Sequence, residues 1–567
     1  MDNRNVRSGD PIPVSNYSDQ PYVVKTDDDG WLMVVTTGAG TEGSKGQHIT
    51  SAKSFDCGKT WSAPVCVESP ENPESSYAVL YKTSYGRVYC FYNYNAENRR
   101  FVLVDPGWLE DEKCYRVDSQ GSFVYKYTDD NGKTWSDKWY EIPQRVMETD
   151  RSNPYGGKVL YFWNVGKPFT LDNSAFVPLY KIGGLKDTFM YKTEGVLLKC
   201  DNINTEKDAA KLHWETLPDG EHGIKVPREV SDVSEEHSFV TLSDGSIFCV
   251  FRTVSGNSYC AYSRDKGHTF TAPEKMTYAD GHPMRHPRAA NFIWKCQNGK
   301  YLYWYHNHGG KTYDDRNPVW LSGAVEYATA DGMRLKFSQP EILLYDPDVM
   351  IRMSYPDMIE EGGEYYFTET QKCLARTHKA EKSLIEGLWS QFDKEGERKH
   401  GTVLKNGSTM PVLRPFIERD HTSNDNHSVD TGAGFSLFLE ADFDKSGVLF
   451  STMTQERIGM EVAFDGEKII FTLSDGRRTN VFYSDKAPLS DKGMHKVTVQ
   501  ADAGSRVVSM MVDRKLCDGA DERQFGYGWF DRSMLHANGR PNAFVGEQVQ
   551  TVELFTEGLT NSEAFWL

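Results

Sequence analysis

One pattern recurs six times in roughly the first two thirds of the chain: a glycine-bearing turn followed by a short apolar, aromatic-rich run. Such runs predict strands buried on both faces, since aromatic and β-branched residues pack well in sheets. Copies about 50 to 90 residues apart are too widely spaced for a solenoid and suit the blades of a propeller. We therefore expect six blades over about residues 10–380, with these runs as inner strands. The runs lie at 29–37, 86–94, 174–180 (without its glycine), 244–252, 298–306 and 362–370.

A second motif, Ser/Thr-x-Asp-x-Gly-x-Thr-aromatic, occurs three times, as SFDCGKTW at 54–61, TDDNGKTW at 128–135 and SRDKGHTF at 263–270. The aspartate can accept hydrogen bonds from the backbone of its own turn, and the glycine supplies the positive φ. We expect the aromatic residue to pack under the hairpin and fix it to the blade. The aspartates are accordingly predicted to be structural: Asp56, Asp130 and Asp265.

Length and composition predict more than one domain and an all-β fold. The chain has 567 residues, 13% of them aromatic, and 48 glycines. Beyond about residue 385 it becomes polar and irregular, and period-two alternation returns near 430. We expect a six-bladed β-propeller at 1–385, a linker at 386–429 and a β-sandwich at 430–567 that serves carbohydrate binding or packing.

The motif and its spacing resemble the Asp-box (BNR) repeats of the sialidase (neuraminidase) superfamily, over about the first 380 residues. The ending TVELFTEGLTNSEAF resembles the closing strand and tail of jelly-roll sandwiches of the laminin-G/concanavalin-like type. The first resemblance implies an active site at the axis of the propeller. In that family three arginines hold the carboxylate of sialic acid, a tyrosine paired with a glutamate is the nucleophile, and an acidic residue donates the proton.

Several residues match the family positions. In EEHSFVTLSDGSIFCVFR, Glu236 stands before the strand and Arg252 at its end, and Arg316 in DDRNPVWLSGAV matches the next arginine. SYPDMIEEGGEYYFTET supplies Tyr355 as the nucleophile and Glu369 at the end of the following strand. The resemblance thus implies a tyrosine–glutamate pair and two arginines at one site.

Two family positions are altered. Where the family reads Arg-x-Pro, this chain has Asp19-Gln20-Pro21, and the loop before the first Asp motif holds Glu42 and His48 but no aspartate. A site with two arginines cannot hold a carboxylate as three arginines do. We therefore expect an exo-glycosidase that removes a terminal anionic sugar of the uronate type, rather than a true sialidase.

The site candidates allow two mechanisms. In a hydrolase, Tyr355 activated by Glu236 attacks the anomeric carbon, and Glu42 or His48 protonates the leaving oxygen. In a polysaccharide lyase, His48 or another histidine removes the proton α to a carboxylate held by the arginines, and Tyr355 protonates the leaving group. A carbohydrate-binding propeller without catalysis is the third alternative. Further predicted substrate contacts are His237, His286, Arg288, His306 and His308.

No cofactor or metal is expected, because the histidines show no diagnostic ligand spacing. The net charge of -17 argues against general nucleic-acid binding, and no apolar run is long enough to span a membrane. The expected partner is an oligosaccharide or polysaccharide substrate. The N-terminus lacks the apolar core of a secretory signal, which suits a cytoplasmic chain or a secreted or periplasmic chain whose signal has been removed.

Overall fold

The computed structural model describes residues 2–411, 413, 434–531 and 538–567. Within them nearly all regular structure is β-strand, and the α-helices are short: α1 (Glu148–Arg151), α2 (Lys382–Ser390) and α3 (Asn561–Phe565). Brief 3₁₀ turns lie at Val6–Ser8, Ala209–Lys211 and Ala487–Leu489. The predicted all-β class is confirmed. In the described part of the chain, no helix is both long enough and apolar enough to cross a membrane.

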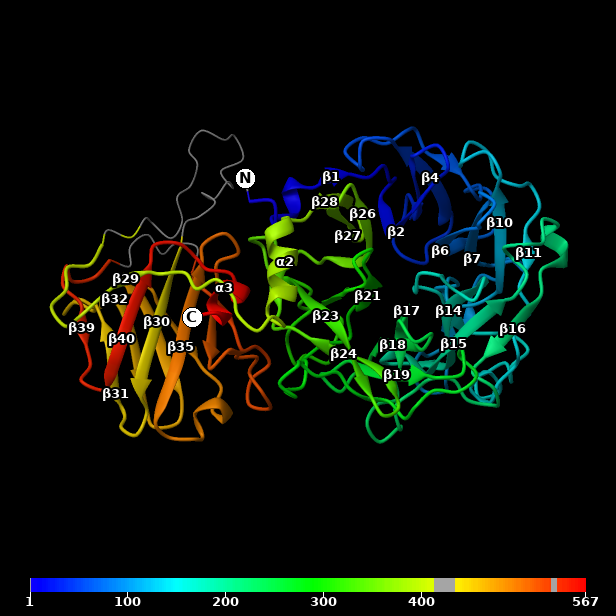
Figure 1. Cartoon of the computed structure of the whole chain (residues 1–567). Helices are drawn as coiled ribbons and strands as arrows, with labels where there is room; N and C mark the ends of the chain where they lie inside the picture. Colours follow the sequence, from blue (N-terminus) through cyan, green and yellow to red (C-terminus); the bar gives the residue numbers. More distant parts are fainter. Residues whose placement is uncertain (1, 412, 414–433, 532–537) are drawn as a thin grey trace.

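Six antiparallel sheets of the described residues follow one another around a common centre (Figure 1). The first two strands of each sheet are β2 (Tyr17–Lys25) and β3 (Trp31–Gly38), β6 (Ser75–Lys82) and β7 (Val88–Tyr94), β12 (Phe162–Trp163) and β14 (Ser174–Lys186), β17 (Glu235–Thr241) and β18 (Ile247–Arg252), β21 (Phe292–Lys295) and β22 (Tyr301–Tyr305), and β26 (Ser354–Glu361) and β27 (Glu364–Thr370). The outer strands are β4 (His48–Ser54) and β5 (Val65–Cys66), β10 (Ser122–Thr128) and β11 (Tyr140–Glu141), β15 (Phe189–Cys200) and β16 (Trp214–Leu217), β19 (Tyr259–Ser263) and β20 (Glu274–Lys275), β23 (Val319–Thr329) and β24 (Gly332–Phe337), and β28 (Ala375–Lys379) and β1 (Asp10–Pro11). Accessory strands are β8 (Val102–Leu103) paired with β9 (Lys113–Cys114), β13 (Phe169–Leu171) beside β14, and β25 (Glu341–Leu344) beside β23.

The six predicted apolar runs fall one to a sheet, and each lies in the second strand of its sheet. Each run therefore lies inside its sheet with a strand on either side, although it is not the strand nearest the centre of the ring (Figure 1). Every residue of β3 and of β7 is buried, since neighbouring sheets cover both faces of these strands. The first strands at the centre are more polar in sequence, and they carry several site candidates.

The N-terminus closes the ring. β1 pairs antiparallel with β28, so that Asp10 lies opposite Thr377, and the last sheet combines both ends of this part of the chain (Figure 1). This pairing ties the N-terminal segment to the last sheet and so fastens the ring, whose sheets keep only short edge strands.

Each of the three predicted Asp turns joins the third strand of a sheet to the fourth. In the first, Asp56 Oδ1 accepts a hydrogen bond from the N–H of Thr60 at 2.9 Å, and Oδ2 accepts one from its hydroxyl at 2.6 Å. Gly58 has a φ of +78°, and its N–H donates to Ser54 Oγ at 2.9 Å. The same bonds recur around Asp130 and Asp265, as expected for a structural role.

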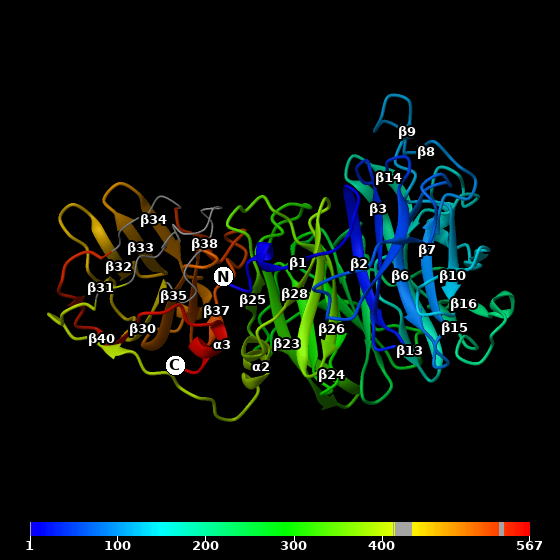
Figure 2. The same cartoon turned by 90° about the horizontal axis from the view of Figure 1, so that it is seen from above.

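The C-terminal part forms two packed sheets (Figure 2). Their shared core is aliphatic and aromatic, with Phe435, Phe471 and Val499 fully buried. One sheet has the order β29 (Thr402–Val403), β40 (Val549–Phe555), β30 (Gly434–Asp442), β35 (Met494–Asp502), β36 (Val507–Val512) and β37 (Lys515–Leu516), with β38 (Gly528–Trp529) beside β36. The other has the order β34 (Thr479–Tyr483), β33 (Ile469–Asp475), β32 (Ile458–Phe464), β31 (Gly447–Ser451) and β39 (Phe544–Val545).

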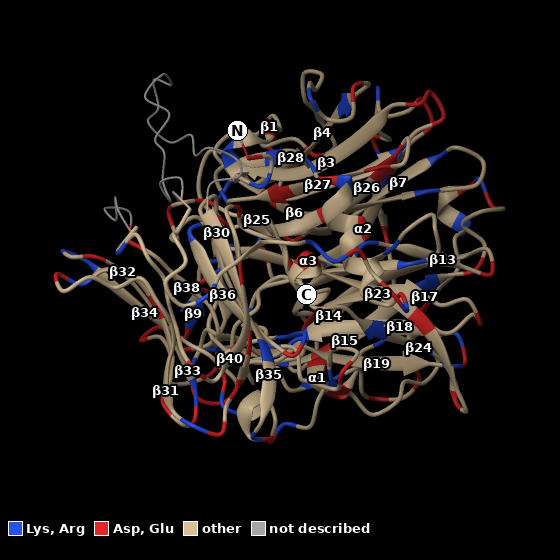
Figure 3. Cartoon of the chain, turned by 60° about the vertical axis from the view of Figure 1, so that its left-hand side comes forward, with Lys and Arg blue, Asp and Glu red and all other residues tan. Residues whose placement is uncertain are grey.

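The predicted linker at 386–429 is only partly described. Its first residues complete α2, and β29 within it pairs with β40 of the sandwich, while residues 412 and 414–429 of it lie outside the described residues. The domain boundaries therefore stay a prediction. Acidic and basic residues are interspersed over the loops and strand ends of both parts (Figure 3).

Candidate active site

A cavity of about 390 Å³ lies near the starts of the first strands of several sheets. Five of the predicted site residues line it: Glu42, Glu236, Arg252, Arg316 and Tyr355. The chain thus brings together candidates from four sheets and their loops. The remaining lining residues are Arg116, Trp163, Tyr180, Phe189, Met190, Thr312, Tyr313, Asp314, Arg352 and Lys372.

Backbone bulges aim the central side chains. The register shifts between Glu235 and Ser238 in β17 and between Ser354 and Asp357 in β26. Glu236 and Tyr355, inside these bulges, have left-handed φ values of +53° and +48°. Such values are uncommon outside glycine, and bulges are frequent where a side chain must be re-aimed.

Tyr355 and Glu236 form a buried pair. The tyrosine hydroxyl donates a hydrogen bond to Glu236 Oε1 at 2.8 Å, and Arg252 lies 2.8 Å from Glu236 Oε2. Burial and the negative charge of Glu236 raise the pKa of Tyr355, although nearby cations partly offset this. The hydroxyl is therefore protonated at neutral pH and stands beside a carboxylate that can accept its proton.

The carboxylate of Glu235 also holds Arg252 in place. Glu235 Oε2 accepts from Arg252 at 2.8 Å, and Glu235 Oε1 accepts from Arg288 at 2.6 Å. Burial would raise the pKa of Glu235, but the two guanidinium groups outweigh it and lower the pKa. Arg288 also lies over the ring of Tyr313, 4.6 Å from its centre. Arg288 thus supports the cavity wall and is not among the residues that line it.

Arg316 reaches the cavity from the loop that precedes β23. Its Nε donates to the carbonyl of Tyr313 at 2.9 Å and one terminal nitrogen donates to Ser354 Oγ at 2.7 Å. The guanidinium lies 6.0 Å from the centre of the Tyr355 ring. Arg252 and Arg316 therefore both place positive charge close to Tyr355.

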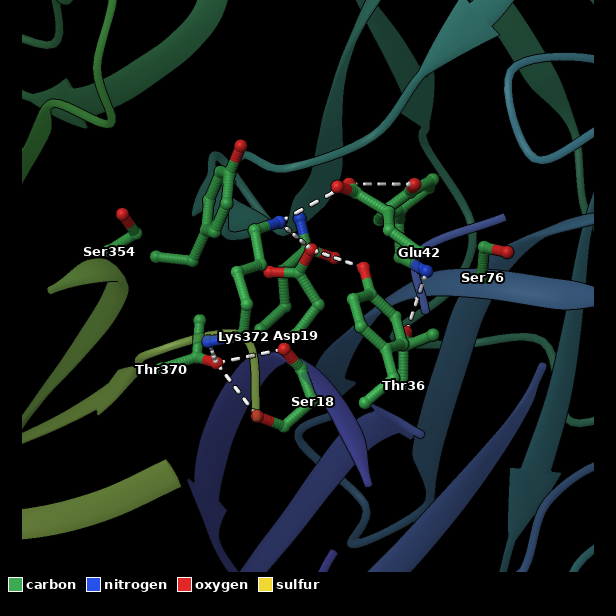
Figure 4. Close-up of polar contacts among 12 residues, drawn as sticks. Ser18, Asp19, Thr36, Glu42, Ser76, Ser354, Thr370 and Lys372 are labelled. Carbon is green, nitrogen blue, oxygen red and sulfur yellow. Dashed lines mark hydrogen bonds and ion pairs between the residues drawn. The ribbon is translucent and has the colours of Figure 1, made fainter. Parts of the chain in front are cut away.

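Lys372 is the cation of the opposite wall (Figure 4). It follows β27, and its Nζ lies 2.6 Å from Asp19 Oδ2, 3.2 Å from Glu42 Oε1 and 4.6 Å from the centre of the Tyr355 ring. Burial would raise the pKa of Glu42, but Lys372 and Arg116 outweigh it and lower the pKa to about 2. Burial raises the pKa of Asp19 despite Lys372. Glu42 is thus held ionised in the unliganded protein.

Asp19, which stands where the sequence resemblance would place an arginine, belongs to this acidic arrangement. Asp19 is buried, accepts a hydrogen bond from the Tyr17 hydroxyl at 2.7 Å and pairs with Lys372. The charge at that position is therefore reversed, and the compensating cation comes from another sheet.

Arg116 and Asp118 extend the charged wall. Arg116 lies 2.6 Å from Asp118 Oδ2 and 3.3 Å from Glu42 Oε1. Its guanidinium also lies 4.7 Å from the centre of the Phe189 ring. The Tyr77 hydroxyl donates to Asp118 and also lies within hydrogen-bond distance of Glu42 Oε1. This wall therefore holds three carboxylates, those of Asp19, Glu42 and Asp118, and two cations.

Three predicted residues lie away from the cavity. His48 begins β4, and its Nδ1 lies 2.9 Å from the carbonyl of Gly46. His237 is buried against the Phe251 ring at 4.6 Å, and burial lowers its pKa to about 3. Glu369 is buried beside His378 at 3.3 Å. None of the three is among the lining residues, so their predicted roles in catalysis and substrate binding gain no support.

The other three histidines are buried near β22 and bond to backbone atoms. His286 and His308 have pKa values lowered to about 3 and about 4 by burial, and burial also lowers the pKa of His306. His306 Nδ1 lies 3.2 Å from the carbonyl of Pro318. None of the three lines the cavity, and in the described ranges no cluster of His, Cys, Asp and Glu could hold a metal ion.

Several residues of the site that lie on loops were not predicted from the sequence. Lys372 directly follows a predicted strand, but no pattern distinguishes it from an exposed lysine. Arg116 and Asp118 stand two residues apart in CYRVDSQ, between predicted strands, and only this spacing of opposite charges could have marked them. Tyr313 lies in an irregular loop without any such signal.

No protein-family model matches the chain, and no match was found among curated protein sequences. Solved structures that resemble it include a protein of unknown function from Dyadobacter fermentans DSM 18053, with 16% identity and a TM-score of 0.43 over 66% of this chain and 97% of that one. The intramolecular trans-sialidase from Ruminococcus gnavus has 13% identity and a TM-score of 0.44, over 65% and 96%. Trypanosoma rangeli sialidase has 11% identity and a TM-score of 0.42, over 99% and 96%. Sequence identities and TM-scores this low do not assign any activity to this chain.

Proposed function

We propose that the protein is a carbohydrate-active hydrolase that releases a terminal, anionic sugar from a glycan, with Tyr355 as nucleophile and Glu236 as its base. The observation that carries the proposal is the 2.8 Å hydrogen bond from the Tyr355 hydroxyl to Glu236, inside a cavity flanked by arginines. A tyrosine beside a buried carboxylate has the geometry of an activated nucleophile.

The proposed reaction has two steps. The Tyr355 oxygen bonds to the anomeric carbon while its proton passes to Glu236, the glycosidic C–O bond breaks, and the leaving oxygen takes up a proton. Water then attacks the anomeric carbon and gives one proton to the group that protonated the leaving oxygen, while Tyr355 departs and recovers its own proton from Glu236. Two displacements retain the configuration of the sugar.

The proton of the leaving oxygen is assigned to Glu42 in the complex with substrate. Without substrate, Lys372 and Arg116 keep the pKa of Glu42 at about 2, so it carries no proton at neutral pH. A substrate anion that pairs with these cations would raise the pKa of Glu42, because it both shields the cations and repels the carboxylate. Anionic substrates are thereby favoured over neutral ones.

Arg316, unlike Arg252, supports an anionic sugar in a second way. Arg252 is occupied by two carboxylates, whereas the bonds that Arg316 makes go to a carbonyl and a hydroxyl. The positive charge of Arg316 is therefore not neutralised by those partners and suits a substrate carboxylate. The histidine-based lyase is not favoured, since the described lining residues include no histidine.

The test is a panel of oligosaccharides capped with uronates or with sialic acids, incubated with the full chain. We expect release of a free sugar of retained configuration, without the ultraviolet absorbance of an unsaturated uronate. The Tyr355→Phe variant should lose this activity by about a thousandfold or more, because it lacks only the nucleophilic oxygen.

Tyr180→Phe is the matched control, since it removes a hydroxyl from another tyrosine that lines the cavity. A Tyr355→Phe variant as active as this control would contradict the assignment of the nucleophile. Unsaturated products would instead establish a lyase, and tight binding without turnover a binding module.

A further inference from the structure

A loop that lines the cavity is closed by one histidine. The cavity loop, residues 306–316, runs from β22 toward β23 and carries Tyr313, Asp314 and Arg316 to the cavity. His308 Nε2 donates to the carbonyl of Asp315 at 2.8 Å, and its Nδ1 accepts from the N–H of Gly310 at 3.1 Å. These bonds assign the neutral tautomer and tie the two ends of the loop together.

The outer side of this loop is covered by the sandwich. Residues 518–527, here called the docking loop, connect β37 to β38. The N–H of Gly309 donates to the carbonyl of Gln524 at 2.8 Å, and the Phe525 ring lies 4.7 Å from the ring of His308. Gln524 Nε2 also donates to Asp315 Oδ2 at 2.9 Å, although both side chains are exposed. The backbone bond and the ring contact therefore carry most of the attachment.

The docking loop is itself braced from within. The buried carboxylate of Asp485 accepts hydrogen bonds from the N–H groups of Asp518 and Gly519 at 2.9 and 3.0 Å, and from the Arg523 side chain at 2.8 Å. A Cβ on Gly526 would lie 2.2 Å from the Cα of Asp518, so the two strands of the loop touch. These internal contacts fix the conformation of the docking loop, so the docking loop can hold the cavity loop in place.

Two further contacts hold the two ends of the docking loop. His282 Nε2 lies 2.7 Å from Asp518 Oδ2, and the ring of Tyr527 lies 5.1 Å from that of Trp320 in β23. Both ends of the docking loop are thus held on the side of the ring that carries β23 and faces the sandwich (Figure 1).

We propose that the C-terminal sandwich is part of the candidate active site, and that its docking loop positions Tyr313 and Arg316 through His308. Arg316 Nε is bonded to the carbonyl of Tyr313, so a displaced cavity loop moves both side chains together. Displacements of about 1 Å are enough to impair catalysis strongly. The expected effect on enzyme kinetics rests on the proposed hydrolase function, whereas the expected effect on the order of the cavity loop does not.

The test compares Phe525→Ala with Asn561→Ala in the full chain. Asn561 lies in the same interface, where its Nδ2 donates to the carbonyl of Pro340 and its Oδ1 accepts from Gln500, neither of which belongs to the cavity loop. Hydrogen exchange of the amides of 309–316 should become roughly fivefold faster in Phe525→Ala, since an aromatic contact that orders them is lost. In Asn561→Ala the exchange of these amides should stay as in the parent chain.

A charge swap provides the rescue. Gln524→Glu places a carboxylate against Asp315 and should loosen the cavity loop, and adding Asp315→Asn should restore the parent exchange by reversing donor and acceptor. Once a substrate is known, Phe525→Ala should raise KM roughly tenfold while kcat changes less, because the displaced residues Tyr313 and Arg316 line the cavity in which the substrate is proposed to bind. Unchanged exchange in Phe525→Ala would overturn the inference. A failure to find any substrate would count against the hydrolase alone, because the exchange result stands without it.

Discussion

Lys372 is the residue on which the charge balance of one cavity wall depends. It is the nearest cation to both Asp19 and Glu42. Asp19 is buried, whereas the side chains of Lys372 and Glu42 are 27% and 25% exposed. Breaking a buried ion pair by removing one partner typically costs about 3–5 kcal/mol, because the other charge stays buried. The wall is therefore sensitive to the loss of a single ammonium group.

We expect Lys372→Met to lower the free energy of unfolding by about 3 kcal/mol at pH 7. Burial already raises the pKa of Asp19 in the parent chain, and loss of the ammonium group raises it further. The folded variant therefore holds a proton more tightly than the unfolded chain, and its stability should recover as the pH falls toward 4. Urea unfolding at several pH values measures this.

The double variant Asp19→Asn with Lys372→Met is the matched control. It removes one charge of each sign and keeps an acceptor for the Tyr17 hydroxyl. Its stability should lie closer to that of the parent chain at pH 7. Equal stability of Lys372→Met and the parent chain would show that the ion pair contributes nothing to folding.

Among the structural elements, the Asp turns show most directly how a local motif stabilises a sheet. In the second turn, Asp130 accepts three hydrogen bonds, from the Thr128 hydroxyl and from the N–H and hydroxyl of Thr134. Trp135, at the end of the motif, donates to Ser51 Oγ in the neighbouring sheet at 2.9 Å. The turn thus joins a hairpin to the sheet beside it.

Asp130→Ala should lower the free energy of unfolding by about 1–2 kcal/mol, since it leaves the donors of the turn without their acceptor. The nearby exposed Asp137→Ala should change stability by less than about 0.5 kcal/mol. Thermal unfolding of both variants provides the measurement. Because the turn is remote from the cavity residues, any enzymatic activity should survive, and a stable but inactive Asp130→Ala would reverse the structural assignment.

The second strands of the sheets could be predicted from sequence, whereas the first strands could not. β7 consists of apolar and aromatic residues after a glycine turn, so its pattern is unambiguous. β17 begins Glu235-Glu236-His237-Ser238, because its start faces the polar centre of the ring and its bulge breaks the alternation. Polar residues of this kind mark a loop by ordinary criteria. Glu236 was found only through its place before the Gly turn.

Residues of the cavity that lie on loops escaped prediction for a related reason. Arg316 had a family position to match, but Lys372 and Arg116 did not, and the partners of a loop residue depend on how separate sheets meet. His308 is the converse case, because the sequence predicts that it contacts substrate. The structure instead bonds it to the backbone of Gly310 and Asp315, within its own loop.

At the scale of the whole molecule, the two parts share one continuous interface. Arg4 near the N-terminus pairs with Asp502 of the sandwich at 2.8 Å, and Gln391 after α2 donates to Ser562 Oγ at 3.0 Å. Apolar residues of both parts, such as Trp320 and Met511, belong to one buried cluster. An interface with this mixture of apolar and polar contacts favours a fixed arrangement over free domain motion.

Glu341 in β25 makes this interface dependent on pH. Its carboxylate is buried and accepts hydrogen bonds from the N–H groups of Asn561 and Ser562, which begin α3, at 3.0 and 2.6 Å. Burial raises the pKa of Glu341 from 4.5 to about 7, although these donors partly offset it. The charge of Glu563 nearby acts in the same direction as burial.

The folded protein therefore holds the Glu341 proton more tightly than the unfolded chain does. It follows that the free energy of unfolding falls as the pH rises from 4.5 to 7, by at most about 3 kcal/mol from this group. Glu341→Gln keeps the shape and loses the titration, so its stability should depend less on pH over this window than that of the parent chain. Urea midpoints of both chains between pH 4.5 and 7.5, together with hydrogen exchange of α3, measure the difference. Parallel curves for the two chains would mean that Glu341 is already ionised throughout the window, held so by the two backbone N–H groups of α3.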